Sequence, residues 1–334
     1  MRTVRINTPS PYDVLIGTGA RAELKNAAGS RAFIVTDGNV AENHLNEFLA
    51  LMDRAGSFTM PAGESHKGHN TLLALYEAMA ERGVTRSDTL VALGGGVVCD
   101  LAGFAAATYM RGIRYIACPT TLIAMADAAI GGKCGVNLSG GKNLVGIVRQ
   151  PSMVIADTDM LGTLPKREYA SGMAEIIKCG AIGDAELFDL TGTDADIGEL
   201  VYRACLVKKD YVEIDEFDQN ERHILNFGHT AGHAIERASG LTLLHGEAVA
   251  TGMMAEARLG ERLGVTRPEA VKRIESALLK AGLPTEYNGD KSALRESLLL
   301  DKKRCGSDIY TALITDIGAA VYMSVPAGEF LKAI

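Results

Sequence analysis

The stretch DTLVALGGGVVCDLAGFAAATYM, residues 88–110, predicts the architecture of the first half of the chain. Its first part, DTLVALGGG, is a continuous apolar run that ends in three glycines, a pattern typical of a strand buried on both faces. Its second part, VVCDLAGFAAATYM, is expected to form a helix. A strand that leads into a helix through a glycine turn is a repeating unit of parallel α/β sheets.

The same alternation continues on both sides of this stretch. Strand-like runs lie at 31–37, 57–63, 114–121 and 152–158, and helical patterns lie at 43–55 and 70–83. Residues 1–17 are expected to form two further short strands. Strands and helices that alternate in this way predict a parallel sheet with helices on its faces.

The pattern changes near residues 158–165. Helix-period segments dominate residues 165–300, and strand-like runs return only at 309–315 and 320–326. A chain of 334 residues is long enough for two domains. We therefore expect an α/β domain over residues 1–160 and a mostly α-helical domain over 161–334, with ligands bound in a cleft between them.

Composition narrows the classes of partner and the compartment. The net charge is −7, and no basic run indicates a nucleic-acid or membrane partner. The six cysteines form no CxxC pair, which argues against a zinc ribbon or a disulfide framework. Free cysteines without a signal peptide suggest a cytoplasmic protein. No apolar run reaches 18 residues, so no transmembrane helix is expected.

Two features of the first half fit a nucleotide phosphate site. Gly94, Gly95 and Gly96 let the backbone approach a ligand where a helix begins, and a helix N-terminus favours phosphate. The run is not G-x-G-x-x-G, so a tight strand–helix turn explains it equally well. Asp37 ends a strand, where it would hold a ribose hydroxyl or cap a turn.

The segment IGGKCGVNLSGGKN, residues 130–143, has five glycines together with Lys133, Lys142 and Asn143. Exposed backbone N–H groups and lysine charges suit a phosphate or a carboxylate, although a flexible surface loop is the simpler interpretation. Asp127, just before this segment, is a candidate counter-charge or ligand to a substrate hydroxyl.

The segment NFGHTAGHAIERASGLTLLHGEAVATGM, residues 226–253, contains His229, His233 and His245, with Glu247 close by. Residues four apart share a helix face, so His229 and His233 are candidates for one metal, although the HExxH glutamate is missing. Zinc accepts imidazole and carboxylate ligands, and further ligands would come from elsewhere in the chain.

Glu175 is a candidate for such a ligand, because an unpaired carboxylate on an apolar helix is unfavourable. An ion pair with Lys178 is the alternative. Lys208, Lys209 and Arg222 precede the histidines and by themselves indicate an ordinary charged face. A metal, a nucleotide turn and nearby cations together would suit redox or elimination chemistry on a polyol phosphate.

Read together, these motifs resemble the 3-dehydroquinate synthase family of sugar phosphate cyclases. The motifs are GGGVVCDLAGFAAATYMRG (94–112), PTTLIAMADAAIGGKCGVNLSGGKNLVG (119–146), LPKREYASGMAEIIK (164–178), LNFGHTAGHAIE with LHGEAVATGM (225–253), and more weakly PAGESHK (61–67) and LDKK (300–303). The resemblance covers nearly the whole chain in order.

The resemblance implies an N-terminal NAD-binding α/β domain, a mostly helical metal- and substrate-binding domain, and a homodimer. It implies conversion of the seven-carbon sugar acid phosphate DAHP (3-deoxy-D-arabino-heptulosonate 7-phosphate) into 3-dehydroquinate and phosphate. The implied steps are transient oxidation by NAD, β-elimination of phosphate, re-reduction and intramolecular aldol closure. A divalent metal, Zn or Co, is implied as second cofactor.

The resemblance also assigns residues. The implied metal ligands are Glu175, His229 and His245, and His233 is implied beside the phosphate, close to the proton transfers. Arg111 resembles an arginine that reaches the neighbouring subunit's site. Implied substrate contacts are Asp127, Lys133, Asn143, Lys178, Lys208, Arg222, Asn226 and either Lys302 or Lys303. Implied NAD contacts are Asp37, Asn39, Glu64, Lys67, Gly95, Gly96, Asp100, Thr120, Thr121, Lys142 and Thr163.

Asp218 and Asn220 depart from the family's usual pattern, where a glutamate and a glycine are common, and Ser171 stands where some members have asparagine. Rival hypotheses are other cyclases, such as 2-deoxy-scyllo-inosose or 2-epi-5-epi-valiolone synthases, metal-dependent alcohol dehydrogenases, and an inactive homologue. Lys133, Lys208 and Arg222 favour a substrate with a carboxylate, which the substrates of those other cyclases lack.

Overall fold

The chain divides between Pro165 and Lys166 into two units in the computed structural model, and the units contain separate sheets. The structure describes residues 1–29, 31–52, 55–240, 242–299, 304–305 and 308–333. The change of pattern expected near 158–165 therefore ends where the first unit ends.

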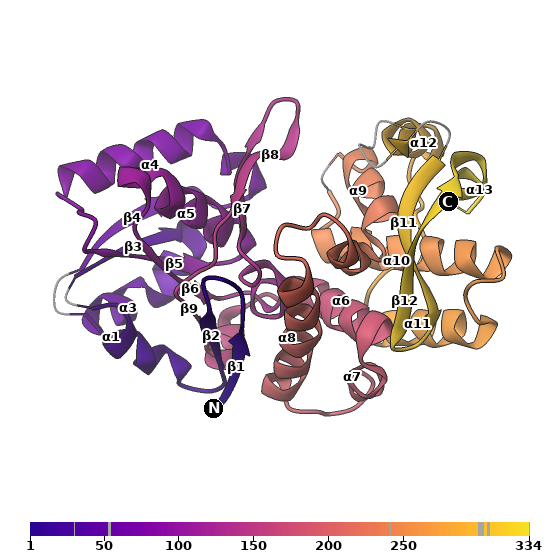
Figure 1. Ribbon diagram of the computed structural model, residues 1–334, viewed down its shortest axis with the longest axis horizontal. Coiled ribbons are helices and arrows are strands. Elements are labelled where there is room, and N and C mark those ends of the chain that lie inside the picture. Colours follow the sequence, from indigo (N-terminus) through magenta and orange to yellow (C-terminus); the bar gives the residue numbers. More distant parts are fainter. Residues whose placement is uncertain (30, 53–54, 241, 300–303, 306–307, 334) are drawn as a thin grey trace. The chain divides into compact units, whose positions relative to one another are not determined.

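The first unit is an α/β unit (Figure 1). Its strands are β1 (Arg2–Ile6), β2 (Tyr12–Ile16), β3 (Ala32–Asp37), β4 (Ala55–Met60), β5 (Thr89–Gly94), β6 (Arg114–Pro119), β7 (Lys133–Leu138), β8 (Gly141–Val148) and β9 (Met153–Ala156). Its helices are η1 (Ala20–Glu23), α1 (Leu24–Ala27), α2 (Gly38–Val40), η2 (Ala41–Leu45), α3 (Asn46–Ala50), η3 (Glu64–His66), α4 (His69–Glu81), α5 (Gly96–Thr108), η4 (Tyr109–Arg111), η5 (Ala124–Ala128) and η6 (Thr158–Thr163).

Seven strands form one sheet in the order β1-β2-β9-β6-β5-β3-β4. Only the pair β1–β2 is antiparallel, and the other neighbours are parallel. β5 is buried along its whole length, as its apolar run predicts. In Figure 1, α4 and α5 lie on one side of the strands β3–β5, and α1 and α3 lie on the other. The predicted parallel sheet with helices on its faces is confirmed.

The strand order creates a switch point between β3 and β5. β4, the strand that follows β3 in the chain, lies on one side of β3, and β5 lies on the other. The connections that leave the carboxyl ends of β3 and β5 therefore diverge. In open α/β sheets, ligands bind in the crevice that such a divergence leaves.

Two local expectations for this unit were wrong. The expected loop at 130–143 is largely the antiparallel hairpin β7–β8. Gly135 and Gly146 pair across it, and a Cβ on either would lie 2.7 Å from a carbonyl oxygen of the opposite strand. These two glycines therefore let the strands approach closely rather than expose N–H groups. The helical segment expected at 43–55 begins at Gly38 and ends at Ala50, with a π-helical stretch over Ala41–Leu45 that disturbs the 3.6-residue period.

The second unit is mostly helical, as expected. Its helices are α6 (Lys166–Gly183), α7 (Ala185–Leu190), α8 (Ile197–Ile214), η7 (Glu221–Asn226), α9 (His229–Ala238), α10 (His245–Arg262), α11 (Pro268–Lys280), α12 (Lys291–Leu299) and α13 (Ala327–Leu331). Its strands, β10 (Arg304–Cys305), β11 (Asp308–Asp316) and β12 (Ala319–Pro326), form a small antiparallel sheet. Its core brings α9, α10 and α12 against β11 and β12.

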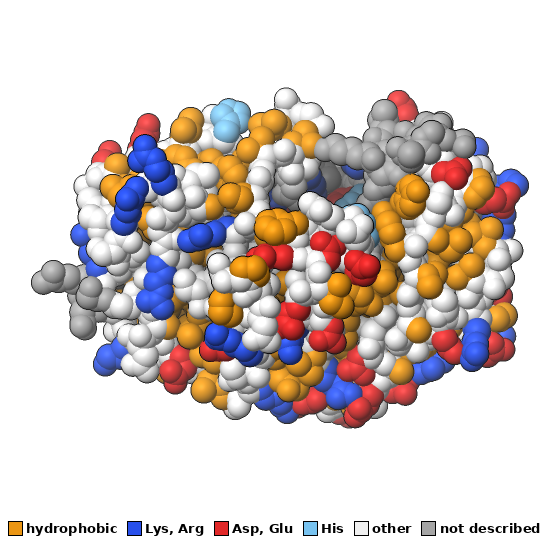
Figure 2. Space-filling view, viewed as in Figure 1, with side chains coloured by type: hydrophobic (Ala, Val, Ile, Leu, Met, Phe, Trp, Pro, Cys, Tyr) orange, Lys and Arg blue, Asp and Glu red, His pale blue; other side chains and the backbone are white. Residues whose placement is uncertain are grey.

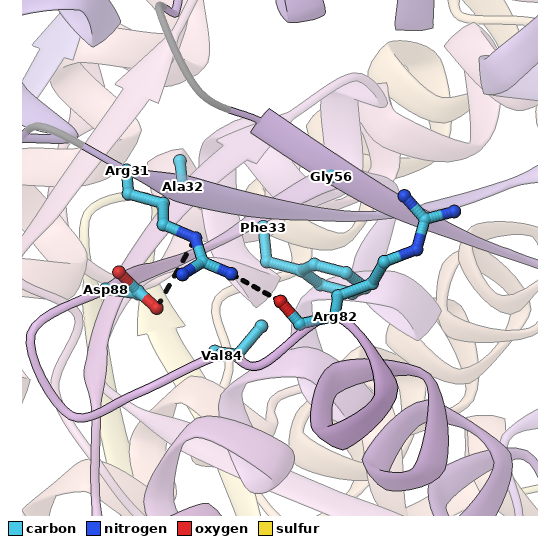
Figure 3. A pocket seen from close by; sticks show the side chains of 7 residues that line it. All are labelled: Arg31, Ala32, Phe33, Gly56, Arg82, Val84 and Asp88. Atoms are coloured by element: carbon cyan, nitrogen blue, oxygen red, sulfur yellow. Dashed lines mark hydrogen bonds and ion pairs between the residues drawn. The ribbon is translucent and has the colours of Figure 1, made fainter.

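Two cavities lie away from the residues that the sequence singles out. In the first unit, a cavity of about 190 Å³ opens where β3 begins, beside Arg31, Phe33, Gly56 and Asp88 (Figure 3). Arg31 faces Asp88 across it at 3.8 Å. In the second unit, a cavity of about 350 Å³ is lined by residues that include Arg258 and Lys291. Neither cavity is lined by a candidate site residue.

The visible surface carries charges of both signs. On the face shown in Figure 2, Lys and Arg side chains are scattered among acidic, hydrophobic and neutral ones rather than gathered into one patch. Among the residues described, no helix has the length and apolar character that crossing a bilayer requires.

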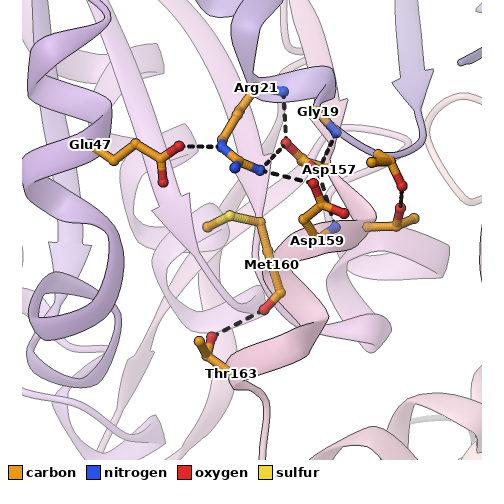
Figure 4. Close-up of polar contacts among 9 residues, drawn as sticks. Gly19, Arg21, Glu47, Asp157, Asp159, Met160 and Thr163 are labelled. Carbon is orange, nitrogen blue, oxygen red and sulfur yellow. Dashed lines mark hydrogen bonds and ion pairs between the residues drawn. The ribbon is translucent and has the colours of Figure 1, made fainter.

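Asp157, directly after β9, ties together two connections at the carboxyl edge of the sheet (Figure 4). Its Oδ1 accepts from Gly19 N at 3.0 Å and from Asp159 N at 3.1 Å. Its Oδ2 accepts from Arg21 N at 3.0 Å and from Arg21 Nη1 at 2.7 Å. The buried carboxylate thus holds η1 beside η6.

We expect Asp157→Asn to destabilise the chain by about 1.5–3 kcal/mol, the usual contribution of a hydrogen bond to a charged group. The amide nitrogen cannot accept the bonds that Oδ2 accepts from Arg21. Urea unfolding measures the difference. Asp159→Asn is the matched control, because Asp159 is 42% exposed and only 3.4 Å from Arg21. Equal stability of the two variants would contradict this prediction.

Candidate metal centre and active site

Three helices of the second unit bring Glu175, His229 and His245 together. Glu175 lies within α6, while His229 and His245 are the first residues of α9 and α10. His229 Nε2 is 3.5 Å from Glu175 Oε1, and His245 Nε2 is 3.4 Å from the same oxygen. One ligand atom from each residue lies within 4.8 Å of the others, an arrangement that suits a metal ion.

Glycines allow the backbones at this centre to approach. A Cβ on Gly246 would lie 2.0 Å from Ser171 O, and Gly246 N donates to Ser171 Oγ at 2.9 Å. This contact sets the start of α10 against α6, one turn before Glu175. A Cβ on Gly252 would lie 2.0 Å from Gly228 O, directly before His229. The side chains converge because these backbones touch.

The ring of His229 has a defined orientation. Its Nδ1 lies 3.2 Å from Phe227 O, which can only accept, so Nδ1 carries the proton in this contact. The lone pair of the neutral ring is then on Nε2, which faces Glu175. Histidine ligands are commonly oriented in this way by a partner at the other ring nitrogen.

Glu175 has a 0% exposed side chain and needs positive charge around it. Lys178 Nζ lies 2.5 Å from its Oε2, so the ion pair considered from the sequence is present. Neither Glu175 oxygen has a well-aligned hydrogen bond within the described residues. Burial would raise the pKa of Glu175, but Lys178, His229 and His245 hold it well below its usual range. The carboxylate is therefore charged, and its donor set fits a divalent cation.

A second group shares His245 and includes a residue that the sequence reasoning missed. Ligand atoms of His233, Glu236 and His245 lie within 4.8 Å of one another. Glu236 Oε2 is 3.8 Å from His245 Nδ1, on the ring edge opposite Glu175. Burial would lower the pKa of His245, but Glu175 and Glu236 raise it to about 9. The spacing of HAIE, which places Glu236 one turn after His233, was the available signal.

Glu247 has a structural role in these contacts. It accepts from the Leu244 backbone N at 2.8 Å at the start of α10, and it pairs with Arg167 at 2.7 Å. It is absent from both groups of potential metal ligands found among the described residues. Its proximity to His245 in sequence is explained by helix capping.

Three candidate substrate contacts are buried cations. Lys178, Lys208 and Arg222 are 1%, 5% and 1% exposed, and they lie on α6, α8 and η7, which pack against one another. Arg222 is held by Glu216 O at 2.7 Å, and its backbone N contacts Asp215. Buried cations are unfavourable unless paired, so this cluster suits an anionic ligand. Asn226 ends η7 and is half-buried.

The first unit gathers the other candidates at the carboxyl edge of its sheet. Gly95 is the N-cap of α5, and residues 95–97 are partly exposed while Gly94 and Val98 are buried. Thr120 N donates to Gly94 O at 3.0 Å, which places the end of β6 beside this turn. A Cβ on Gly95 would lie 3.0 Å from Thr121 Cγ2. Gly96 begins α5, so backbone N–H groups face the switch point.

Lys67 links several candidates in one polar network. It is 3% exposed, binds Asp100, contacts Asn143 Oδ1 at 2.7 Å and lies 3.8 Å from Glu64. Asn137, which the sequence reasoning missed, donates to Glu64 Oε1 at 2.7 Å and accepts from Asn143 N at 2.8 Å. The network joins the hairpin β7–β8 to η3 and α5.

The remaining candidates are placed as follows. Asp37 caps α2 through Oδ1, with Asn39 N at 2.9 Å and Val40 N at 3.1 Å, so the capping alternative is present. Thr163 contacts His44 at 2.8 Å. Asp127 is half-buried in η5, and Lys133, Lys142 and Arg111 are exposed. Lys302 and Lys303 lie outside the described residues.

This fold defines the class of sugar phosphate cyclases. A 2-deoxy-scyllo-inosose synthase structure, complexed with carbaglucose-6-phosphate, NAD+ and Co2+, has a TM-score of 0.92 at 25% identity and covers 99% of this chain and 98% of that one. A 2-epi-5-epi-valiolone synthase from Streptomyces hygroscopicus subsp. jinggangensis 5008, with NAD+ and Zn2+ bound, has a TM-score of 0.89 at 30% identity, covering 100% and 97%.

The sequence identifies the family within that class. Residues 57–171 match the family described as 3-dehydroquinate synthase N-terminal, and residues 172–304 match 3-dehydroquinate synthase C-terminal. The 3-dehydroquinate synthase of Caldanaerobacter subterraneus subsp. tengcongensis is 42% identical over 325 residues, covering 93% of this chain and 91% of that protein. The chain belongs to the 3-dehydroquinate synthase family.

We expect Gly252→Ala to separate α9 from α10 and to destabilise the second unit. Its Cβ meets backbone atoms, 2.0 Å from Gly228 O and 2.6 Å from Gly232 N, which cannot rotate away. Overpacking of this kind costs about 1–3 kcal/mol or more. Thermal unfolding measures the loss. Gly328→Ala is the control, because its Cβ would meet nothing within 4 Å. A Gly252→Ala protein as stable as this control would show that the helices have room to move.

Proposed function

We propose that this chain converts DAHP into 3-dehydroquinate and phosphate. The observation that carries the proposal is the convergence of Glu175, His229 and His245 in a chain that matches both halves of the 3-dehydroquinate synthase family. Two other features support it: buried cations in the same unit and a glycine turn at the sheet's switch point.

We propose NAD and a divalent metal, Zn or Co, as cofactors. The two cyclase structures contain NAD+ with Co2+ or Zn2+, and the residues present here fit both groups. Gly95, Gly96, Thr120 and Thr121 would hold the NAD phosphates near the first turn of α5, with Asp37 and Lys67 contributing further contacts. Glu175, His229 and His245 would hold the metal. When bound, NAD takes and returns a hydride, and the metal lowers the pKa of a substrate alcohol.

The chain's own side chains then bind and orient the substrate. Lys178, Lys208 and Arg222 supply positive charge for the phosphate and the carboxylate, and Asn226 supplies an amide for a hydroxyl group. An imidazole nitrogen of His233, half-buried one turn after His229, is placed to hold or move a proton near the phosphate. Lys133, Asn143 and Asp127 of the first unit are proposed as further substrate contacts.

The other hypotheses are less well supported. The relatives named 3-dehydroquinate synthase reach 42% identity, whereas the two other cyclase structures reach 25% and 30%. A metal-dependent alcohol dehydrogenase would release NADH in each turnover and would not need three buried cations for an anionic substrate. The intact ligand and cation positions argue against an inactive homologue.

The deciding experiment is incubation with DAHP, NAD and Zn2+ or Co2+. Phosphate release and absorbance at 340 nm are followed together. A synthase releases phosphate without net NADH, because the hydride is returned to the substrate. Stoichiometric NADH would indicate a dehydrogenase, and no phosphate release from DAHP would refute the proposed function. Glucose 6-phosphate, a substrate without a carboxylate, is the control for the other cyclases.

The metal assignment predicts different losses for three variants. Glu175→Ala and His245→Ala should lose bound metal and essentially all activity. His233→Ala should keep near-stoichiometric metal but turn over about 10²–10⁴-fold more slowly, the usual effect of losing a general acid or base. Metal analysis of dialysed proteins and steady-state rates provide the test.

The alternative pairing gives the opposite result. If His233→Ala is metal-free while His245→Ala retains metal, the ligands are the helical pair His229 and His233. Glu247→Gln serves as a control for the neighbouring carboxylate that caps α10, and it should retain metal.

We further propose a cytoplasmic homodimer in which Arg111 contributes to the neighbouring subunit's site. Met110 and Arg111 are exposed and have φ angles of 50° and 67°, unusual for non-glycine residues. Such a backbone conformation costs on the order of 1–3 kcal/mol and is often found at functional sites. A functional role for Arg111 explains why this turn retains the strain.

Mixed subunits test this assignment. Arg111→Ala and Lys133→Ala should each be nearly inactive alone. A heterodimer of the two would contain one site with both defects and one site with neither, so mixing should restore activity to some of the sites. Subunit exchange is verified with differently tagged chains. Exchange without recovered activity would show that Arg111 acts within its own subunit or has no role in the site.

A further inference from the structure

A second buried carboxylate lies beside the proposed metal centre without belonging to its ligand set. Glu256 is 0% exposed on α10, almost three turns after His245. Its Oε2 accepts from Gly228 N at 2.8 Å, and its Oε1 accepts from Ala231 N at 3.0 Å. These two N–H groups lie on either side of His229 in the sequence, at the start of α9.

The first turn of α9 needs this carboxylate because its N-cap residue has no side chain. Gly228 is the N-cap, with a φ of 80°. A Cβ there would lie 2.5 Å from Met253 Cγ and 2.9 Å from Val249 O, so the serine or aspartate that usually caps a helix has no room. Glu256 supplies the acceptor from the neighbouring helix instead. The negative charge also suits a helix N-terminus.

The contact continues through one peptide bond to the imidazole. Gly228 N and Phe227 O belong to the same planar peptide unit. Glu256 accepts from its N–H, and its carbonyl oxygen lies 3.2 Å from His229 Nδ1. A carboxylate on the N–H side polarises the peptide and strengthens the bond that its carbonyl accepts. The chain of contacts runs from Glu256 through the 227–228 peptide to Nδ1, and it leaves Nε2 facing Glu175.

We propose that Glu256 is a positioning residue for the metal centre. It fixes the rotation and the tautomer of His229 and makes Nε2 a better donor, without touching the metal or the substrate. The carboxylate, which usually contacts a histidine ligand directly, here acts through a peptide group. This inference rests on the proposed role of His229 as a metal ligand.

Glu256→Gln is the most informative variant. The amide keeps the shape of the side chain but has one acceptor oxygen and no charge, so one of the two N–H groups loses its partner. We expect metal affinity to fall about 10- to 100-fold, the usual effect of losing such a partner. The visible spectrum of the Co2+-loaded protein should also change. Saturating metal should restore most of kcat, because the substrate-binding cations are intact.

Glu261→Gln is the matched control: the same substitution on the same helix at an exposed position. Its metal affinity and Co2+ spectrum should equal those of the unchanged protein. NAD affinity, which depends on the first unit, should be equal in all three proteins. Glu256→Asp, which keeps the charge but shortens the reach, should bind metal with intermediate affinity and provides the measurement if the Gln variant does not fold.

Metal titrations without substrate separate this proposal from the proposed reaction. A folded Glu256→Gln protein with unchanged Co2+ spectrum and affinity would reduce Glu256 to a helix cap and overturn the inference. If metal binding weakens as expected but no variant acts on DAHP, the inference stands and the proposed function fails. If the unchanged protein binds neither Zn2+ nor Co2+, the centre itself is absent and the inference fails with it.

Discussion

The burial of the Glu175 carboxylate is the constraint on which the second unit depends. A charged group that is 0% exposed is tolerated only when positive partners surround it. Lys178 provides one partner from the same helix, and the starts of α9 and α10 bring two imidazoles within 3.5 Å. Without a cation among these groups, the carboxylate has no well-aligned hydrogen bond. The arrangement is poor as a purely structural contact and good as a metal site.

Backbone contact is the means by which the chain meets this constraint. Short imidazole and carboxylate side chains can share one ion only if their backbones are close. Gly246 against Ser171, and Gly252 against Gly228, leave no space for even a Cβ atom. The same closeness removes the usual helix cap from α9, and Glu256 replaces it from α10. The metal centre and the helix packing are therefore one feature and not two.

Much of the fold was predictable, because strands buried on both faces are continuous apolar runs, as in β5. The candidate ligands were also predictable, since a glutamate on an apolar helix needs a reason. The same reasoning should have selected Glu256, another carboxylate among apolar residues of a helix. The hairpin β7–β8 was not predictable from glycine content, because glycine serves a loop and a close strand pair equally well. Nor could helical spacing alone distinguish His233 from His245, because the choice depends on how α6, α9 and α10 pack.

The two units meet anionic groups by different physical means, and this difference bears on specificity. At the edge of the sheet, the glycine turn offers backbone N–H groups and a helix dipole, which suit any phosphate and discriminate little. In the helical unit, Lys178, Lys208 and Arg222 are full charges that were desolvated during folding. A substrate with too few negative groups would leave one of these cations without a counter-charge, a penalty larger than any lost contact in water. Discrimination between a substrate that carries both a carboxylate and a phosphate and one that carries only a phosphate therefore depends on these three side chains, whereas the metal centre and the glycine turn suit both substrates.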